Sequence, residues 1–215
     1  MKIGVFDSGV GGKSVADALS NALADHEVIF INDSENMPYG DKTDEELERL
    51  VTPKIQLLID KGCQIIVVAC NTVSCTIFPK IRSKFTVEIV GIVPMVKPAC
   101  NLTKSGKIAV CATPRTLSSP RYEELKNEFA SKVEVFEPDC SNWARMIESS
   151  QVNYKQIRET IDSVCRDGAD VVVLGCTHYH WIREEILKYT KGRAQVIQPE
   201  SAIVDRVKTL IEQLA

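Results

Sequence analysis

The chain has 215 residues, 44% hydrophobic and 26% charged, with a formal net charge of −3. Its length can bury the core of one large domain or two small ones, and its composition is typical of a globular protein. The mild charge and the lack of a Lys/Arg-rich run disfavour nucleic acid as a partner, and the lack of a signal-peptide core or a membrane-length apolar run predicts a soluble, cytoplasmic protein.

The predicted elements alternate between strands and helices, a pattern typical of a parallel α/β sheet. The first half predicts strand 2–7, helix 14–24, strand 27–31, helix 44–61, strand 64–69 and strand 88–93. The second half predicts strand 107–111, helix 120–131, strand 133–136, helices 142–149 and 154–166, strand 169–175, helix 181–189, strand 196–197 and helix 202–214. The helix from 44 follows Thr43-x-x-Glu46, which fits a capping box.

Two pairs of segments indicate an internal repeat. Lys2-Ile3-Gly4-Val5 resembles Lys107-Ile108-Ala109-Val110, which lies 105 positions later, and Cys176 lies 106 positions after Cys70. Offsets that agree within one residue favour a duplication. We therefore expect an α/β fold of two similar three-layer lobes with mainly parallel sheets, pseudo-two-fold related, with the active site in the cleft between them. Residues 1–95 plus 203–215 would form the N-terminal lobe carrying Cys70, and residues 96–202 the second lobe carrying Cys176.

A cysteine follows a strongly apolar predicted strand in each half. Cys70 comes after residues 65–69, and Cys176 comes after residues 171–175. Residues just past the C-terminal end of a buried parallel strand face the ligand crevice of an open α/β sheet. Each thiol also precedes a predicted helix, whose N-terminus lowers a thiol pKa, and Asp7 and His178 are neighbours that can carry protons. Two thiols in corresponding positions suggest a reaction that needs an acid and a base of the same kind.

The eight cysteines do not indicate a disulfide framework, because neither a secretion signal nor a small loop-rich scaffold is present. No Cys-x-x-Cys pair supports a zinc ribbon or a thioredoxin-type motif. The run Cys176-x-His178-x-His180 leaves a metal site as an alternative, although a fourth ligand is not evident. Core positions are expected for Cys63, Cys100, Cys111 and Cys165, Cys75 and Cys140 stay unassigned, and His26 is expected in solvent.

The segment Asp7-Ser8-Gly9-Val10-Gly11-Gly12-Lys13-Ser14 ends in Gly-Lys-Ser, as a phosphate-binding P-loop does. That motif needs glycine where Asp7 stands, and a carboxylate there would repel phosphate. Neither candidate neighbouring strand ends in a magnesium-binding Asp. We expect instead a tight strand-to-helix turn that brings backbone N–H groups and Ser8 near a ligand carboxylate, with a nucleotide enzyme as the weaker alternative.

Four segments together resemble glutamate racemases of the aspartate/glutamate racemase superfamily. They are Ile3-Gly4-Val5-Phe6-Asp7-Ser8-Gly9-Val10-Gly11-Gly12, Pro38-Tyr39-Gly40, Ala69-Cys70-Asn71-Thr72 and Leu174-Gly175-Cys176-Thr177-His178-Tyr179. Weaker matches are Val93-Pro94 with Lys97-Pro98-Ala99, Ala112-Thr113 with Thr116, and Glu148. The resemblance runs over nearly the whole chain and implies an isomerase that uses no cofactor.

The resemblance further implies a two-base racemisation of L-glutamate to D-glutamate, which supplies the peptidoglycan of a bacterial cell wall. Cys70 and Cys176 would flank the substrate as thiolate and thiol, roles that suit a group with an ordinary pKa of about 8.5. Asp7 would assist Cys70, His178 would assist Cys176, and Glu148 would lie further out. Substrate-binding roles are implied for Asp7, Ser8, Tyr39, Gly40, Asn71, Thr72, Thr113, Thr116, Thr177 and His178. The implied partner is a small-molecule substrate, glutamate, without nucleic acid or membrane, and a homodimer stays open.

The chain also departs from the family's pattern. It is shorter than usual members, and Lys13, Cys75 and His180 replace other residue types, with His180 expected at the surface of a helix start. Arg115 adds a cation near the expected side-chain pocket, so the choice between glutamate and aspartate stays open. The alternatives are an aspartate or broader-specificity racemase, a Cys/His metal or redox protein, and a non-catalytic amino-acid-binding module.

Overall fold

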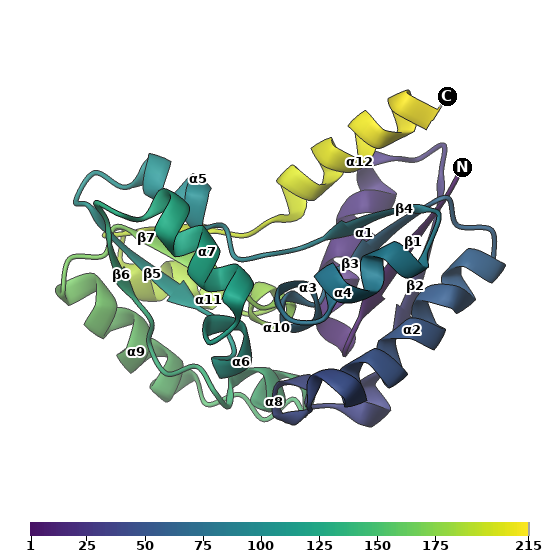
Figure 1. Ribbon diagram of the computed structural model, residues 1–215. Coiled ribbons are helices and arrows are strands. Elements are labelled where there is room, and N and C mark those ends of the chain that lie inside the picture. The colour runs from purple at the N-terminus through teal and green to yellow at the C-terminus, as the bar shows by residue number, and fades with distance from the viewer. Residues whose placement is uncertain (215) are drawn as a thin grey trace. The chain divides into compact units, whose positions relative to one another are not determined.

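The computed structural model describes residues 1–214, which divide into two compact units (Figure 1). One unit consists of Met1–Ile92 together with the segment from Pro199 onward, and the other consists of Val93–Gln198. Each unit is built on its own four-stranded parallel sheet. Every helix of the described chain is too short or too polar to cross a membrane.

The first unit has a sheet of strand order β2-β1-β3-β4. Its strands are β1 (Lys2–Asp7), β2 (Glu27–Asn32), β3 (Ile65–Val68) and β4 (Glu88–Gly91). Its α-helices are α1 (Lys13–Ala22), α2 (Asp44–Asp60), α3 (Asn71–Cys75), α4 (Phe78–Ile81) and α12 (Glu200–Leu214). Single 3₁₀ turns are η1 (Val10–Gly12), η2 (Ser34–Asn36), η3 (Tyr39–Asp41) and η4 (Arg82–Lys84).

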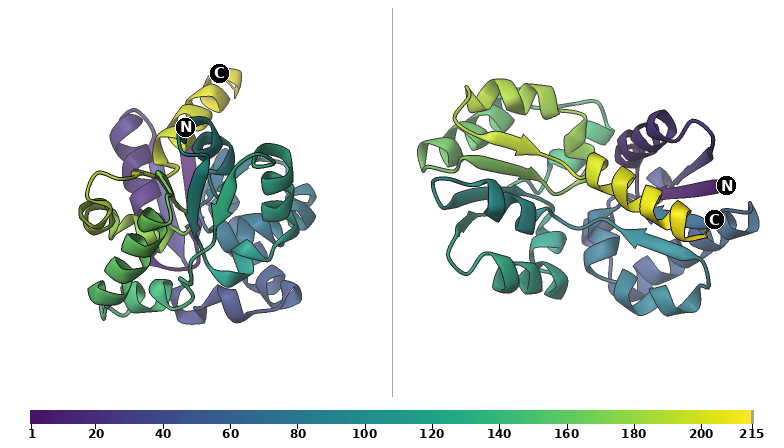
Figure 2. Two further views of the ribbon diagram at one scale, coloured as in Figure 1. Left: turned by 90° about the vertical axis from the view of Figure 1, so that its left-hand side faces the viewer. Right: turned by 90° about the horizontal axis from the view of Figure 1, so that it is seen from above.

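Helices cover both faces of this sheet because the side chains of each strand alternate between two apolar clusters. On one face, α2, α3 and α4 pack on Phe6, Ile66 and Val68. On the other face, α1 and α12 pack on Ile3 and Val5 and on the remaining β3 residues. Helix α12, yellow in Figure 2, contacts α1 although most of the chain separates the two in sequence. The first unit is therefore a three-layer α/β structure made from two separate pieces of chain.

The second unit has a sheet of strand order β6-β5-β7-β8. Its strands are β5 (Lys107–Cys111), β6 (Glu134–Phe136), β7 (Val171–Leu174) and β8 (Gln195–Ile197). Its helices are α5 (Val96–Leu102), α6 (Pro114–Leu117), α7 (Pro120–Phe129), α8 (Trp143–Glu148), α9 (Tyr154–Arg166), α10 (Thr177–His180) and α11 (Arg183–Thr190). Helices α8–α11 supply the core on one face of the sheet, and α5 and α7 supply it on the other.

The two sheets have the same strand order when β1–β4 are matched with β5–β8. In the first sheet Ile3 pairs with Ile65, and in the second Ile108 pairs with Val171. These matched residues lie 105 and 106 positions apart, the offsets found in the sequence. The predicted α/β fold with two similar parallel sheets is confirmed.

The long predicted elements are present with shifts of one or two residues at their ends. The capping box of α2 is also present, because Thr43 Oγ1 accepts from the Glu46 N–H at 3.2 Å and Glu46 Oε2 accepts from the Thr43 N–H at 2.8 Å. The helices expected directly after Cys70 and Cys176 are present as α3 and α10, although the sequence pattern did not indicate their bounds. Helices of five and four residues are too short to show a helical repeat of apolar positions.

Candidate active site

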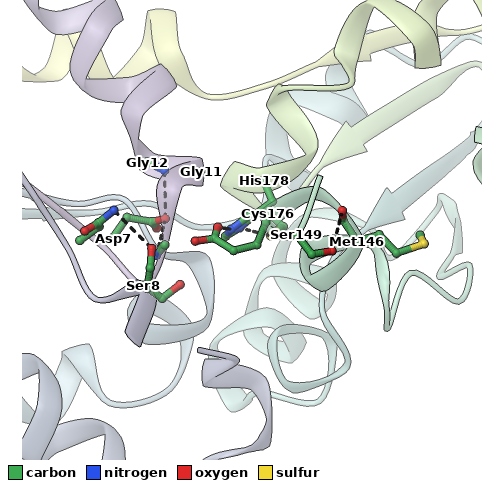
Figure 3. A network of polar contacts seen from close by, with 12 residues as sticks. Asp7, Ser8, Gly11, Gly12, Met146, Ser149, Cys176 and His178 are labelled. Carbon is green, nitrogen blue, oxygen red and sulfur yellow. Dashed lines mark hydrogen bonds and ion pairs between the residues drawn. The ribbon is translucent and has the colours of Figure 1, made fainter. Parts of the chain in front are cut away.

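The carboxylate of Asp7 is fully buried at the C-terminal end of β1, where the chain turns towards η1 (Figure 3). Its Oδ2 accepts hydrogen bonds from the backbone N–H groups of Gly12 at 2.9 Å and Gly9 at 3.2 Å. The predicted tight turn is therefore present. The sequence predicted that N–H groups of this turn would lie near the carboxylate of a ligand. For Gly9 and Gly12 this prediction is wrong, because both N–H groups donate to the carboxylate of Asp7.

Gly12 permits this close approach because it has no side chain. A Cβ at this position would lie 2.3 Å from the Cβ of Asp7 and 2.9 Å from its Cγ, closer than packed atoms come. The loop is thus folded around a carboxylate at the place where a P-loop cradles phosphate. This arrangement removes the support for a nucleotide enzyme.

Cys70 lies beside Asp7 and Ser8 because β3 is the direct neighbour of β1. The Ala69 N–H donates to the carbonyl of Phe6 at 2.8 Å, which extends the pairing to the ends of both strands. The Cys70 thiol is 5% exposed, and its Sγ lies 3.4 Å from the Oγ of Ser8, to which it donates. The structure therefore brings together the thiol and the hydroxyl that the sequence predicted for this unit.

Asn71, the first residue of α3, is 3% exposed. Neither its amide nitrogen nor its amide oxygen has a hydrogen-bond partner among the described residues. Leaving a buried amide unsatisfied costs free energy, so such a group in a native structure calls for a polar partner from outside the chain. The side chain next to the thiol is thus equipped to bind a group that carries both donors and acceptors.

Tyr39 lies in η3, which contacts α3, and is 2% exposed in the same core cluster as Cys70. Its hydroxyl donates to Asp33 Oδ2 at 2.7 Å. Gly40 is partly exposed in the same turn, and Thr72 is buried in α3. Asp33 was missed in the sequence, although it follows the end of β2 as Asp7 ends β1, and the same strand-end rule could have found it.

In the second unit, Cys176 follows the end of β7 and lies beside His178 (Figure 3). The distance from Cys176 Sγ to His178 Nδ1 is 3.8 Å, and His178 Nε2 lies 2.6 Å from Glu148 Oε2. An ionised carboxylate only accepts, so the imidazole hydrogen sits on Nε2, and Nδ1 faces the thiol. A thiol, an imidazole and a carboxylate thus form one chain able to move a proton and stabilise an imidazolium.

The remaining predicted residues of this unit lie at the ends of β5 and β7. Thr113 N-caps α6, and its hydroxyl lies 2.9 Å from that of the buried Thr116. Thr177 is buried as the first residue of α10. The Thr113 hydroxyl also accepts from the Thr116 N–H at 3.3 Å.

Two predictions about histidines are wrong. His180 is 7% exposed at the last position of α10, because this short helix begins at Thr177 and carries its side chains into the core. His26 is partly buried, and its Nδ1 lies 3.2 Å from the amino group of Met1. Within residues 1–214, no group of three or more Cys, His, Asp and Glu side chains could hold a metal ion.

The other thiols have the surroundings of core residues. Burial raises the pKa of Cys63, Cys100 and Cys165. Burial also raises the pKa of Cys140, and the neighbouring Cys111 adds to this shift. Cys75 is 2% exposed in α3. Thiols held neutral by burial are poor nucleophiles and poor bases, which distinguishes Cys63, Cys100, Cys140 and Cys165 from a reactive thiol.

Two units with parallel sheets of the same strand order define the class of this protein's fold as α/β. The model of the Asp/Glu/Hydantoin racemase family matches residues 3–207, and the chain belongs to this family.

Individual relatives agree with this assignment. The glutamate racemase of Fusobacterium nucleatum is 37% identical over 215 residues, covering 97% of this chain and 81% of the relative. That of Methylococcus capsulatus is 33% identical over 214 residues, covering 98% and 79%. The crystal structure of Escherichia coli glutamate racemase in complex with L-glutamate and an activator matches with a TM-score of 0.85 at 29% identity, covering 98% of this chain and 82% of that one.

Proposed function

We propose that this racemase interconverts L-glutamate and D-glutamate by a two-base mechanism, with Cys70 and Cys176 as the catalytic residues. The observation that carries the proposal is the placement of one cysteine after the matched strands β3 and β7 of two sheets with the same order. Glutamate is favoured as the substrate because the relatives that cover most of this chain are glutamate racemases.

The proposed reaction breaks and remakes one C–H bond. The thiolate of one cysteine takes the proton from Cα, and the thiol of the other donates its proton to the opposite face, so each ends in the other's starting form. Asp7 is proposed to assist Cys70, and His178 with Glu148 to assist Cys176. The reverse reaction exchanges the two roles.

Binding of the substrate is proposed to satisfy polar groups around the thiols. The amide of Asn71 can donate to a carboxylate and accept from an ammonium group. Ser8, Tyr39, Gly40, Thr72, Thr113, Thr116 and Thr177 are the other proposed contacts. Hydrogen-bond donors aimed at the substrate carboxylate would stabilise the negative charge that develops when Cα loses its proton.

The test is to incubate the protein with L-glutamate in deuterated water and follow the Cα–H signal by NMR, together with the chirality of the product. We expect D-glutamate to carry deuterium at Cα from the first turnovers, while unreacted L-glutamate keeps its hydrogen. This asymmetry is expected because two separate groups remove and return the proton. Early exchange into unreacted L-glutamate at the rate of racemisation would contradict a two-base mechanism.

Substitution separates catalytic thiols from core thiols. Cys70→Ala and Cys176→Ala are each expected to abolish racemisation, because either change removes the acid or the base. Cys100→Ser is the matched control, since this thiol is only partly buried in α5 and lies outside the site. A Cys70 or Cys176 variant with full activity would exclude that residue from catalysis.

The same experiment with L-aspartate tests the substrate. Exchange with aspartate and none with glutamate would overturn the proposed specificity while leaving the racemase class intact. We also propose that the D-glutamate supplies peptidoglycan, which predicts that the gene restores growth to a bacterium that requires added D-glutamate. Failure of the active protein to do so would reject that role.

A further inference from the structure

A buried carboxylate outside the predicted site organises the segment that carries Tyr39. Asp33 directly follows β2 and is 2% exposed. Its Oδ2 accepts from the Tyr39 hydroxyl at 2.7 Å, and its Oδ1 accepts from Asn36 Nδ2 at 3.0 Å and from Lys54 Nζ at 2.9 Å. The carboxylate thus joins the end of β2, the turns η2 and η3, and the long helix α2.

These donors keep Asp33 ionised inside the protein. Burial raises the pKa of Asp33, but the hydrogen bonds from Tyr39, Asn36 and Lys54 outweigh burial and hold the pKa below its usual value. An isolated charge in this place would be costly, whereas a carboxylate with three donors, one of them cationic, is stable. Asp33 is therefore a fixed anion against which other groups can be placed.

The contact with Asp33 determines what the Tyr39 hydroxyl can do. Its one hydrogen is given to the carboxylate, so the oxygen is left as an acceptor. Burial, and after it the Asp33 carboxylate, raise the pKa of Tyr39, with further contributions from Cys70 and Asp7. The hydroxyl stays protonated and keeps its orientation, in a core cluster shared with Cys70.

We propose that Asp33 is a positioning residue for the reaction, which holds Tyr39 and the η3 turn against the helix α3 that begins at Cys70. Tyr39 then presents an oxygen acceptor, which suits an ammonium group and not a carboxylate. The claim that Asp33 assists the reaction rests on the proposed function. The claim that Asp33 holds the η3 turn against α3 concerns the packing around Cys70 and can be measured without substrate.

The first experiment measures the alkylation rate of each cysteine by iodoacetamide, with peptide mass spectrometry, in the wild type, Asp33→Asn and Tyr39→Phe. Tyr39→Phe removes one hydroxyl and leaves Asp33 with Asn36 and Lys54, so it tests the inference even if Asp33→Asn fails to fold. We expect Cys70 to react about tenfold faster in both variants, because losing a hydrogen bond to a charged group loosens the turn locally.

Cys63 provides an internal control, because it is 2% exposed just before β3 in the same core cluster. We expect its rate to stay at the wild-type value while that of Cys70 rises. An equal rise in the alkylation rates of Cys63 and Cys70 would indicate general destabilisation of the protein and would overturn the inference. An unchanged alkylation rate at Cys70 would overturn it as well. Asp17→Asn is the matched substitution, since it removes a carboxylate from an exposed ion pair with Lys13 in the same unit.

The second experiment measures kcat and KM with glutamate for the same variants and for the double variant. Asp33→Asn and Tyr39→Phe are each expected to lower kcat/KM roughly tenfold, and the double variant is expected to be no worse than Asp33→Asn. Additive losses would show that the two residues act separately and would overturn the inference. If the wild type does not act on glutamate while the alkylation pattern holds, the proposed function fails and the placement of Tyr39 by Asp33 stands.

Discussion

At the residue scale, the contact between His178 and Glu148 gives the thiol of Cys176 an imidazole neighbour that is itself held by a carboxylate. The imidazole lies between the thiol and a carboxylate that is 19% exposed, at 3.8 Å from one and 2.6 Å from the other. A carboxylate in this position stabilises a protonated imidazole and fixes which ring nitrogen faces the thiol. In the proposed mechanism, His178 therefore holds a proton during the step at Cys176.

Glu148→Gln tests this relation. The amide keeps the size of the side chain but loses its charge, so we expect kcat to fall roughly 10- to 100-fold, the effect of losing one charge-assisted hydrogen bond. The measurement is the initial rate in both directions, followed by circular dichroism of glutamate. Glu124→Gln is the control, because this exposed residue pairs with Arg121 in the same unit. A wild-type kcat for Glu148→Gln would remove this carboxylate from the mechanism.

Strand ends were the part of the site that the sequence could predict. Asp7, Cys70 and Cys176 all stand where an apolar run stops, and the geometry of a parallel sheet places such residues at one edge. The contact of Glu148 with His178 could not be derived from spacing, because it depends on how α8 packs against α10. The burial of His180 was missed for a related reason, since the extent of α10 decides which way its side chains point.

At the element scale, Asp170 anchors the start of β7 to the loop between α5 and β5. Its carboxylate accepts from the Thr103 hydroxyl and from the N–H groups of Lys104 at 2.7 Å and Ser105 at 2.8 Å. Burial raises the pKa of Asp170, but these hydrogen bonds outweigh burial and leave the pKa below its usual value. The ionised form thus stabilises the fold.

The sign of this shift predicts a pH dependence. A carboxyl group with a lowered pKa in the folded state stabilises the protein above its unfolded pKa of about 4, and the stabilisation is lost as the pH falls through the folded value. Asp170→Asn is expected to lower the free energy of unfolding by about 1–2 kcal/mol at pH 7 and by progressively less below pH 4. Urea unfolding at a series of pH values measures this difference. A difference that does not change with pH would contradict the assigned role of the charge.

Element boundaries show where local sequence signals are sufficient. The start of α2 was predicted because Thr43 and Glu46 satisfy each other's backbone at the helix end, which depends on four consecutive residues. The bounds of the helix α3 could not be predicted because Asn71–Cys75 is entirely buried and has no exposed face. A buried segment of five residues shows the same pattern whether it is a strand or a helix.

At the scale of the whole molecule, α12 completes the core of the first unit from the far end of the chain. Ile203, Val204, Val207 and Leu210 are buried with the residues of α1, β1 and β3. The sequence could predict two similar lobes with parallel sheets, because the two halves share an offset. The side chains that α12 buries depend on tertiary packing and could not be derived from that offset.

Leu210→Ala tests the contribution of α12. Leu210 is 3% exposed, so its truncation is expected to cost about 2–4 kcal/mol of unfolding free energy in the first unit. Both tryptophans of the chain, Trp143 and Trp181, lie in the second unit. Tryptophan fluorescence therefore reports the second unit, whereas far-UV circular dichroism reports the helices and strands of both. For Leu210→Ala, guanidinium unfolding should show a lower midpoint by far-UV circular dichroism than by tryptophan fluorescence. Leu214→Ala, at a residue 48% exposed on the same helix, is the control and should shift neither signal. Equal shifts of both signals would contradict the prediction.

The discontinuous make-up of the first unit has a consequence for synthesis on the ribosome. All of Val93–Gln198 leaves the ribosome before α12, so the second unit can fold while the first still lacks one wall of its core. Synthesis of the first unit thus begins before that of the second unit and is completed after it. During that interval the apolar face of α1 and of the strands that α12 later covers stays open to solvent, and exposed apolar surface of this kind favours aggregation of a nascent chain.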